Sequence, residues 1–537
     1  MDSNKVKTLE PLDTVDSIPG RVVAADEERL AQLGHQKELK RQFSLTTLGA
    51  LCLYLMATWE ATSTVIAQAL LSGSQLRPPI AFDSYNYILH RLYFCIASSL
   101  GEIASIYSTA GGTCPYTNPF SKPNELGESN QRFPPGQYHW VAALSPPRSR
   151  CLAALTTGWV SVGGLIVFCA SAAFAAGLQT QFLIIMNEDS YIPQRWQGLL
   201  FYLAILLYAG VMNIWGSQLL PHANMISDQG VIHVAGFVAL LIVLGVMAPK
   251  NAPSFVFTEF VNSSGWSNDG VSWLVGLISA VYDAACHMAE EIPDAPPNVP
   301  FAMVGSLVAN GLMGLTYCTV LLFSTGSLES LLTTPTGFPF MQIYLDATRS
   351  RAGATVLSLL LIVMATAATV GGITSASVPF DASFSYVNKR QQVPLEAMVF
   401  VTTSQMLLEF LYLVSSTAFN AVLSMAIIGI YISYSIPIVY MLLSGRNKLT
   451  WNEYEPFKLG SFLGPLLNVI SLVWMTVVII FSPFPSSQPV TAQNMNYYTV
   501  VMAGWLLFGL LYYFLKGKAK FEVPIAVSDV VEGAGSN

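Results

Sequence analysis

Residues 44–71 read SLTTLGALCLYLMATWEATSTVIAQALL, a long apolar run with one charged side chain, Glu60, near its middle. A helix needs about 20 mostly apolar residues to cross the roughly 30 Å of hydrocarbon in a bilayer. Runs of this length recur along the chain, and a spanning segment must satisfy its own backbone hydrogen bonds. The sequence therefore predicts an all-α, polytopic membrane protein, with a charge at a depth where membrane helices normally avoid one.

Twelve such apolar stretches are predicted to span the membrane. They cover residues 44–71, 89–110, 152–186, 196–215, 230–248, 271–289, 302–323, 352–373, 395–414, 418–443, 462–481 and 497–515. Because the number of spans is even, both tails lie on the same side. Lys and Arg gather in the tails and loops of that side, so the positive-inside rule predicts that both termini are cytosolic.

The composition supports the membrane class and excludes others. Of 537 residues, 53% are hydrophobic and only 11% are charged, whereas soluble domains carry about 25% charged residues. This excludes a soluble enzyme, a disordered protein and a nucleic-acid binder. The net charge of −7 indicates no partner. The seven cysteines are scattered, without a CxxC pair, so no disulfide framework is expected.

Two corresponding spans carry an acidic residue at mid-depth. Trp59-Glu60-Ala61 in the first span and Tyr282-Asp283-Ala284 in the sixth share the order aromatic, acidic, alanine. This spacing is expected of an inverted repeat, in which spans 1–5 and 6–10 are related and the first helix of each is broken. A broken helix exposes backbone N–H and C=O groups. Its two ends suit the carboxylate and the ammonium group of a zwitterion.

The candidate substrate site consists of the two broken segments. Its residues are Ala57, Thr58, Trp59, Glu60, Ala61 and Thr62 in the first span, and Val281, Tyr282, Asp283, Ala284 and Ala285 in the sixth. The candidates for proton coupling or gating are Glu60, Asp283, His287, Glu290 and Glu291. For Glu60 and Asp283, the alternative is a cap on a half-helix or a pair with a neighbouring helix. For His287, the alternative is a hydrogen bond within the bundle.

Four further ionisable residues in or near the membrane are interpreted mainly as structural. Glu290 and Glu291, nearer the cytosolic face, are expected to be structural or gating residues rather than substrate ligands. Glu102 in span 2 is expected to bond to another helix, and His233 in span 5 is a weaker proton candidate. With no HExxH motif and no paired histidines, we predict no catalytic residue, no metal and no cofactor.

Several stretches together resemble one family. They are Leu33-Gly34-His35 with Lys40-Arg41-Gln42-Phe43-Ser44, Trp59-Glu60-Ala61 with Leu70-Leu71-Ser72-Gly73, Ile96-Ala97-Ser98-Ser99-Leu100-Gly101-Glu102-Ile103-Ala104-Ser105 with Thr109-Ala110-Gly111-Gly112, Gln137-Tyr138-His139-Trp140-Val141-Ala142, and His287-Met288-Ala289-Glu290-Glu291 with Asn298-Val299-Pro300. In these stretches the chain resembles the fungal amino-acid/choline permeases, which are GABA-permease-like members of the amino acid–polyamine–organocation superfamily.

The resemblance implies a leucine-transporter-like fold of five plus five inverted helices with two extra helices. The corresponding segments are a cytosolic tail at 1–43, the first repeat at 44–248, the second repeat at 271–443, two additional helices at 462–515 and a cytosolic tail at 516–537. It also implies proton-coupled symport of an amino acid, GABA or choline by alternating access, with substrate bound by the broken segments. The partners would be this solute, protons and the lipid bilayer. The plasma membrane is the expected location, with the vacuolar membrane as the alternative.

The chain departs from the family pattern in three places. Residues 113–135 interrupt a run that the family writes continuously, residues 74–93 lack its apolar start of span 2, and Val378-Pro379-Phe380 follows Ser377 without the family's basic segment. Phe301 also stands where the family usually has arginine. The alternative function is therefore a non-transporting nutrient sensor, an inactive paralogue or the product of an incorrectly predicted gene. No residue set in the sequence distinguishes between the candidate solutes.

Overall fold

The structure is a computed structural model that describes part of the chain. The described residues are 45–71, 81–106, 136–219, 222–257, 262–277, 295–326, 331, 334, 337–377, 393–446 and 457–518. The predicted insert at 113–135 and the junction at 378–380 lie outside them. Within the described residues the chain is built from helices and the loops that join them.

The helices fall into a long and a short group. The long ones are α4 (Ala81–Ile106), α6 (Arg150–Asn187), α7 (Arg195–Leu219), α8 (His222–Met247), α11 (Ala295–Phe323), α14 (Arg351–Ala376), α15 (Leu395–Val414), α16 (Ser416–Tyr440), α18 (Leu463–Phe481) and α19 (Tyr498–Tyr512). The short ones are α2 (Leu45–Met56), α3 (Thr58–Leu71), α5 (Gln137–Leu144), α9 (Pro253–Phe257), α10 (Asp269–Leu277), α13 (Pro339–Thr348) and the π-helical ends η3 (Met441–Gly445) and η5 (Tyr513–Gly517).

Nine of the described helices are long and apolar enough to cross a membrane, so the protein is a polytopic helical membrane protein, as predicted. Helix α15 has the predicted bounds, Leu395–Val414. Helix α7 carries exposed tryptophans near both ends, Trp196 and Trp215. About five helical turns, roughly 28 Å, separate them. That distance matches the hydrocarbon thickness, and tryptophan rings prefer the two membrane interfaces.

The other three predicted spans take different forms in the described residues. The first consists of two helices, α2 and α3, which are separated at Ala57. The second is α4, which begins at Ala81, earlier than the predicted residue 89, and includes the charged residues Asp83 and Arg91 in its first half. Of the sixth, the structure describes only the beginning, helix α10.

Helices α5 and α13 were not among the predicted elements, because neither is long enough to span a bilayer. Helix α13 starts with Pro339 at its first position, where the missing N–H costs nothing. It ends at Arg349, whose φ of 51° stops the helix. Helix α13 packs against α3, α8 and α14 on the side predicted to be extracellular.

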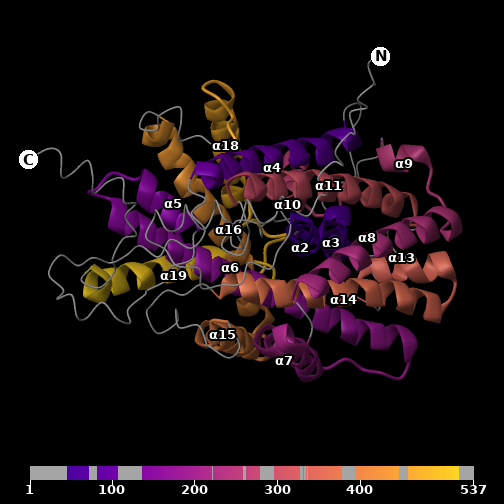
Figure 1. Cartoon of the computed structure of the whole chain (residues 1–537). Coiled ribbons are helices and arrows are strands. Elements are labelled where there is room, and N and C mark those ends of the chain that lie inside the picture. The colour runs from indigo at the N-terminus through magenta and orange to yellow at the C-terminus, as the bar shows by residue number, and fades with distance from the viewer. Residues whose placement is uncertain are drawn as a thin grey trace, which may run out of the picture.

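The broken first span lies inside the helix bundle. Figure 1 shows α2 and α3 in the interior, with α11 on one side and α8 and α14 on the other, in agreement with their packing contacts. Helices α7 and α15 lie side by side at an edge of the bundle. The broken span is thus surrounded by protein and not by lipid, which is where unpaired backbone groups are tolerated.

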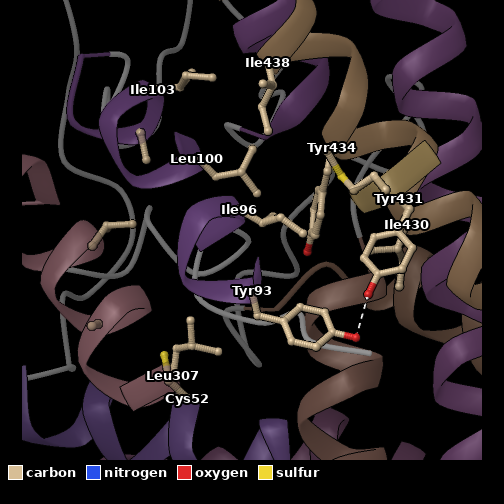
Figure 2. Packing of buried hydrophobic residues seen from close by; sticks show 14 of the residues in the cluster. Cys52, Tyr93, Ile96, Leu100, Ile103, Leu307, Ile430, Tyr431, Tyr434 and Ile438 are labelled. Carbon is tan, nitrogen blue, oxygen red and sulfur yellow. Dashed lines mark hydrogen bonds between the residues drawn. The ribbon is translucent and has the colours of Figure 1, made fainter. Parts of the chain in front are cut away.

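Two large apolar clusters pack around this centre. In one, residues of α4 pack against α16: Figure 2 shows Ile96 and Leu100 facing Ile430 and Tyr434, with the Tyr431 hydroxyl donating to Tyr93 over 3.1 Å. The other cluster joins α3, α8, α11, α13 and α14 on the predicted extracellular side. Trp59 belongs to this second cluster, so packed side chains lie between α3 and that side.

Candidate functional site

The first span is interrupted by a single residue. Ala57 has a φ of 39°, in the left-handed region that costs an L-residue with a side chain about 1–2 kcal/mol. Its N–H donates to the Leu53 carbonyl over a long 3.4 Å. That carbonyl also accepts the Asn310 side-chain amide of α11 at 3.2 Å. The predicted break in span 1 is therefore present, and α11 supports it from the side.

Two glycines bring neighbouring helices close to the break. A Cβ on Gly230 of α8 would lie 2.7 Å from the Ala50 side chain, and one on Gly314 of α11 would lie 2.8 Å from Thr58. Real Cβ atoms do not approach other atoms this closely, so only glycine permits these contacts. Small residues at helix contacts are the usual means of close packing in membranes. Here they place α8 and α11 directly beside the start of α3.

One face of α3 is buried against these helices. Trp59, Ser63, Ile66 and Leu70, spaced by three or four residues, are all inaccessible or nearly so. The ring of Trp59 is the centre of this face. Its centroid lies 5.7 Å from the ring of His233, 6.3 Å from that of Phe237 and 5.6 Å from that of Tyr317.

Glu60 forms an ion pair with a histidine from a distant part of the chain. One carboxylate oxygen, Oε1, lies 2.7 Å from Nδ1 of His233 on α8, and both side chains are buried. At this distance the two groups share a proton, either as carboxylate with imidazolium or as carboxylic acid with imidazole.

Several polar atoms around the pair find no hydrogen-bond partner in the described part of the chain. They are Oγ1 of Thr58, Nε1 of Trp59, Oε2 of Glu60, Nε2 of His233 and Oδ1 of Asn310. An unpaired buried polar atom costs about 1–3 kcal/mol. The set includes both donors and acceptors, so it is complementary to a ligand that carries both. Such a concentration of unpaired atoms at a helix break indicates a binding site.

A chain of hydroxyls leads from α3 toward the predicted extracellular side. The Ser63 hydroxyl donates to the Trp59 carbonyl at 2.9 Å and lies 2.7 Å from the Tyr317 hydroxyl of α11. Tyr317 in turn lies 2.7 Å from the hydroxyl of Tyr344 on α13. All three hydroxyl-bearing residues are fully buried. The chain connects the broken span to the short outer helix and contributes to closing the site on that side.

The predicted site residues fall into two groups. Ala57, Trp59 and Glu60 lie at the break and the ion pair as described, whereas Ala61 is exposed and points to the other side of α3. Thr62 bonds back to the Thr58 carbonyl of its own helix. The candidates of the sixth span lie outside the described residues: Val281, Tyr282, Asp283, Ala284, Ala285, His287, Glu290 and Glu291.

Sequence reasoning gave little weight to the partner of Glu60. His233 and Glu60 are 173 positions apart, and nothing local marks a single histidine in an apolar helix as the partner of an acid. Asn310 and Tyr317 were not recognised at all. The available signal was their polarity inside a predicted span, since intramembrane polar groups usually face other protein groups.

Glu102 forms the inter-helix bond that we expected. Its carboxylate pairs with the Arg446 guanidinium and accepts the N–H of Leu459 at 3.0 Å. Arg446 follows η3, and Leu459 precedes α18. With these donors the fully buried carboxylate is satisfied by protein groups, unlike that of Glu60. Glu102 therefore joins helices on the predicted cytosolic side, and its carboxylate does not contribute to the site at α3.

Comparison with known proteins decides the class. Residues 124–507 match the family described as amino acid permease. The chain belongs to the amino acid permease family. The permease is thus a membrane transporter and not an enzyme, in agreement with its apolar helices and the resemblance seen in the sequence.

Individual relatives cover nearly the whole permease. A choline transporter of Saccharomyces cerevisiae is 29% identical, over 96% of this chain and 86% of its own. An amino-acid permease of Arabidopsis thaliana is 24% identical, over 94% of this chain and 97% of its own. A homologous amino-acid permease of Oryza sativa is also 24% identical, over 93% of this chain and 96% of its own.

Proposed function

We propose that this permease moves a small solute with a cationic nitrogen together with a proton, by alternating access. The solute is an amino acid, GABA or choline; the names of the relatives include choline and amino acids. The observation that carries the proposal is the buried Glu60–His233 pair at the break in span 1. It combines an unpaired carboxylate oxygen for the cation with a proton shared between the two residues.

The two oxygens of Glu60 have different roles in this proposal. Oε1 contacts His233, while Oε2 has no partner among the described residues and is available to a cationic nitrogen. In a buried site, a carboxylate–ammonium hydrogen bond is about twice as strong as a neutral one. Trp59 packs against His233, the partner of Glu60, and aromatic rings attract cations.

The charge of the solute would couple its binding to the binding of a proton. A zwitterionic solute would bring its carboxylate to the start of α3, where the first N–H groups of the helix favour an anion. A negative group near the His233 ring stabilises the protonated imidazole, so solute and proton bind more tightly together than separately. Asp283 and His287 of the sixth span are proposed to complete the site from the opposite side.

Alternating access requires that one group of helices moves. We propose that spans 1, 2, 6 and 7 rock against the remaining helices of the two five-helix repeats, with both termini cytosolic and the protein in the plasma membrane. The cluster around Trp59 and the hydroxyls of Ser63, Tyr317 and Tyr344 support a conformation that is closed toward the outside. Opening to the outside would separate α3 and α11 from α13.

The experiment is uptake by the purified permease in liposomes with an imposed inward proton gradient. Labelled GABA, several amino acids and choline are offered in turn. We expect concentrative uptake of one of these classes, which a protonophore abolishes. Glu60→Gln keeps the size and hydrogen-bonding capacity of the side chain but removes its charge. We expect at least a 100-fold lower uptake rate, or about 2.7 kcal/mol, for this variant at unchanged membrane insertion.

Glu396→Gln is the matched control, because Glu396 is an exposed residue in the first turn of α15. It should transport as the wild type does. Uptake that a protonophore leaves unchanged would contradict proton coupling, and normal uptake by Glu60→Gln would contradict the site. Solute binding without any uptake would instead favour the nutrient-sensor alternative.

A further inference from the structure

A third buried acid, besides Glu60 and Glu102, lies on α15, away from the broken span. Glu409 on α15 is fully inaccessible, and neither of its carboxylate oxygens has a hydrogen-bond partner in the described residues. An ionised carboxylate without a partner in an apolar interior is among the most costly groups a protein can bury. Something must therefore compensate its charge or remove it.

A polar side chain next to Glu409 has an acceptor without a partner. One turn earlier on the same face of α15, Gln405 donates its amide to the Ile166 carbonyl of α6 at 3.3 Å, while its Oε1 has no partner in the described chain. The hydroxyl of Tyr202 on α7 donates to the Gln405 backbone carbonyl at 2.9 Å, so its proton is already committed. Oε1 of Gln405 and both carboxylate oxygens of Glu409 are thus buried without a partner in the described chain, one helical turn apart.

The described helices around Glu409 supply no cation that pairs with it. Two ionisable groups interact electrostatically with it, Tyr202 of α7 and Tyr412 of α15 itself, and neither is a cation. Two of the helices that pack against α15 are α16 and α6. Helix α16 contains no acidic or basic residue, and the only charged residue of α6 is Arg150, its first residue.

The remaining two packed helices each have one arginine, at the first residue. Arg351 of α14 forms an ion pair with Asp189 at 2.8 Å. Arg195 of α7 lies over the ring of Tyr412, with its Cζ 5.9 Å from the ring centroid. Within the described part of the chain, neither arginine forms a hydrogen bond or an ion pair with Glu409. The charge on this carboxylate is thus uncompensated by either arginine.

We propose that Glu409 is a proton-binding site. In this conformation its carboxyl group is protonated, and the O–H donates a hydrogen bond to Oε1 of Gln405. The proton comes from water, and no other bond is made or broken. A single O–H then satisfies one oxygen of Glu409 and the unpaired oxygen of Gln405. Residues four apart lie next to each other on a helix, which makes this bond sterically available. This second proton site is separate from the site at α3.

The test is infrared spectroscopy of the permease reconstituted in lipid at neutral pH. A protonated carboxylic acid has a carbonyl-stretch band that an ionised carboxylate lacks. We expect Glu409→Gln to lose one such band relative to the wild type. Glu396→Gln, on the exposed first turn of the same helix, should lose a carboxylate signal instead. Labelling the wild type with ¹³C-glutamate should also shift the acid band. This control does not depend on whether a variant folds.

A second variant tests the acceptor. Gln405→Leu removes the oxygen that is proposed to accept the proton, so the acid band should shift while it persists. The proposal is overturned if the wild type has no acid band that disappears in Glu409→Gln. It is also overturned if sodium or potassium ions, varied at constant pH, perturb a carboxylate signal of Glu409. The measurement needs no transport, so its result is independent of the proposed function.

Discussion

Tryptophans in two regions of this permease have opposite surroundings. Trp159 of α6 and Trp505 of α19 stack at 4.6 Å, and each indole N–H donates to the other's carbonyl, at 2.9 and 3.1 Å. The rings lie against Gly163 and Gly509, where an added Cβ would come within 2.6 Å of them. Trp59 of α3 is more deeply buried than either, yet its indole N–H has no partner among the described residues.

The difference separates a structural joint from a site that binds a ligand. At the contact between α6 and α19, the polar atoms of both indoles are used and the glycines make room for the rings, so nothing further is needed. At the start of α3, by contrast, an ion pair and a helix break leave several polar atoms unused. Buried unpaired atoms are costly, and those at the start of α3 support the substrate site proposed there.

The largest expected effect is a loss of stability when the contact between Trp159 of α6 and Trp505 of α19 is removed. Trp159→Ala removes the stacked ring and its hydrogen bond, and we expect a loss of about 3–5 kcal/mol, as for other buried aromatic residues. Thermal unfolding of the detergent-solubilised permease, followed by size-exclusion chromatography, measures it. The folded fraction should transport at the wild-type rate. Loss of transport by correctly inserted molecules would show that this contact is more than a joint.

A matched pair of conservative variants sharpens the comparison. Trp505→Phe removes the indole N–H that donates to the Trp159 carbonyl, which lies inside α6 and keeps its intrahelical bond; we expect a cost of about 0.5–1.5 kcal/mol of stability without an effect on transport. Trp59→Phe breaks no hydrogen bond of the described structure. Its smaller ring leaves a cavity at a fully buried position, which we expect to cost about 1–3 kcal/mol of stability, and the solute concentration for half-maximal uptake should rise. The opposite pattern of uptake would refute the distinction between the two regions.

A histidine outside the predicted spans gives an effect that appears only in acid. Burial lowers the pKa of His139 on α5 to about 4, from a usual value of 6.5. The folded state therefore favours the neutral ring, and the stability gained is fully present above pH 6.5. It is lost as the pH falls from 6.5 toward 4. Thermal unfolding of the wild type should weaken over this interval more than that of His139→Gln; equal pH dependence would contradict it.

Much of the fold was predictable because membrane spans have a strong local signal. The apolar run at 395–414 coincides with α15, and the break in span 1 was expected from a single acid among apolar residues. Helices α5 and α13 were missed because short helices beside a membrane lack that length signal. Glu409 lies in a predicted span and had the same signal as Glu60, an acid in an apolar run, but it was not singled out.

The site was only half predictable from the sequence. Glu60 and Trp59 were identified from their position in the broken span. The partners that define their chemistry, His233 and Asn310, come from helices far along the chain and have no motif. Pairing of this kind depends on which helix faces pack together. Periodicity in one segment does not contain that information, because it shows which face is buried but not what covers it.

The central claim is that the Glu60–His233 pair couples solute movement to a proton. Its most direct test records solute entry and internal acidification in the same liposomes, for the wild type and for His233→Gln. Glutamine can still donate to Glu60 but cannot take up a proton. We predict that solute exchange between equal concentrations continues in the variant while solute-driven acidification disappears. Acidification per solute equal to that of the wild type would contradict the claim.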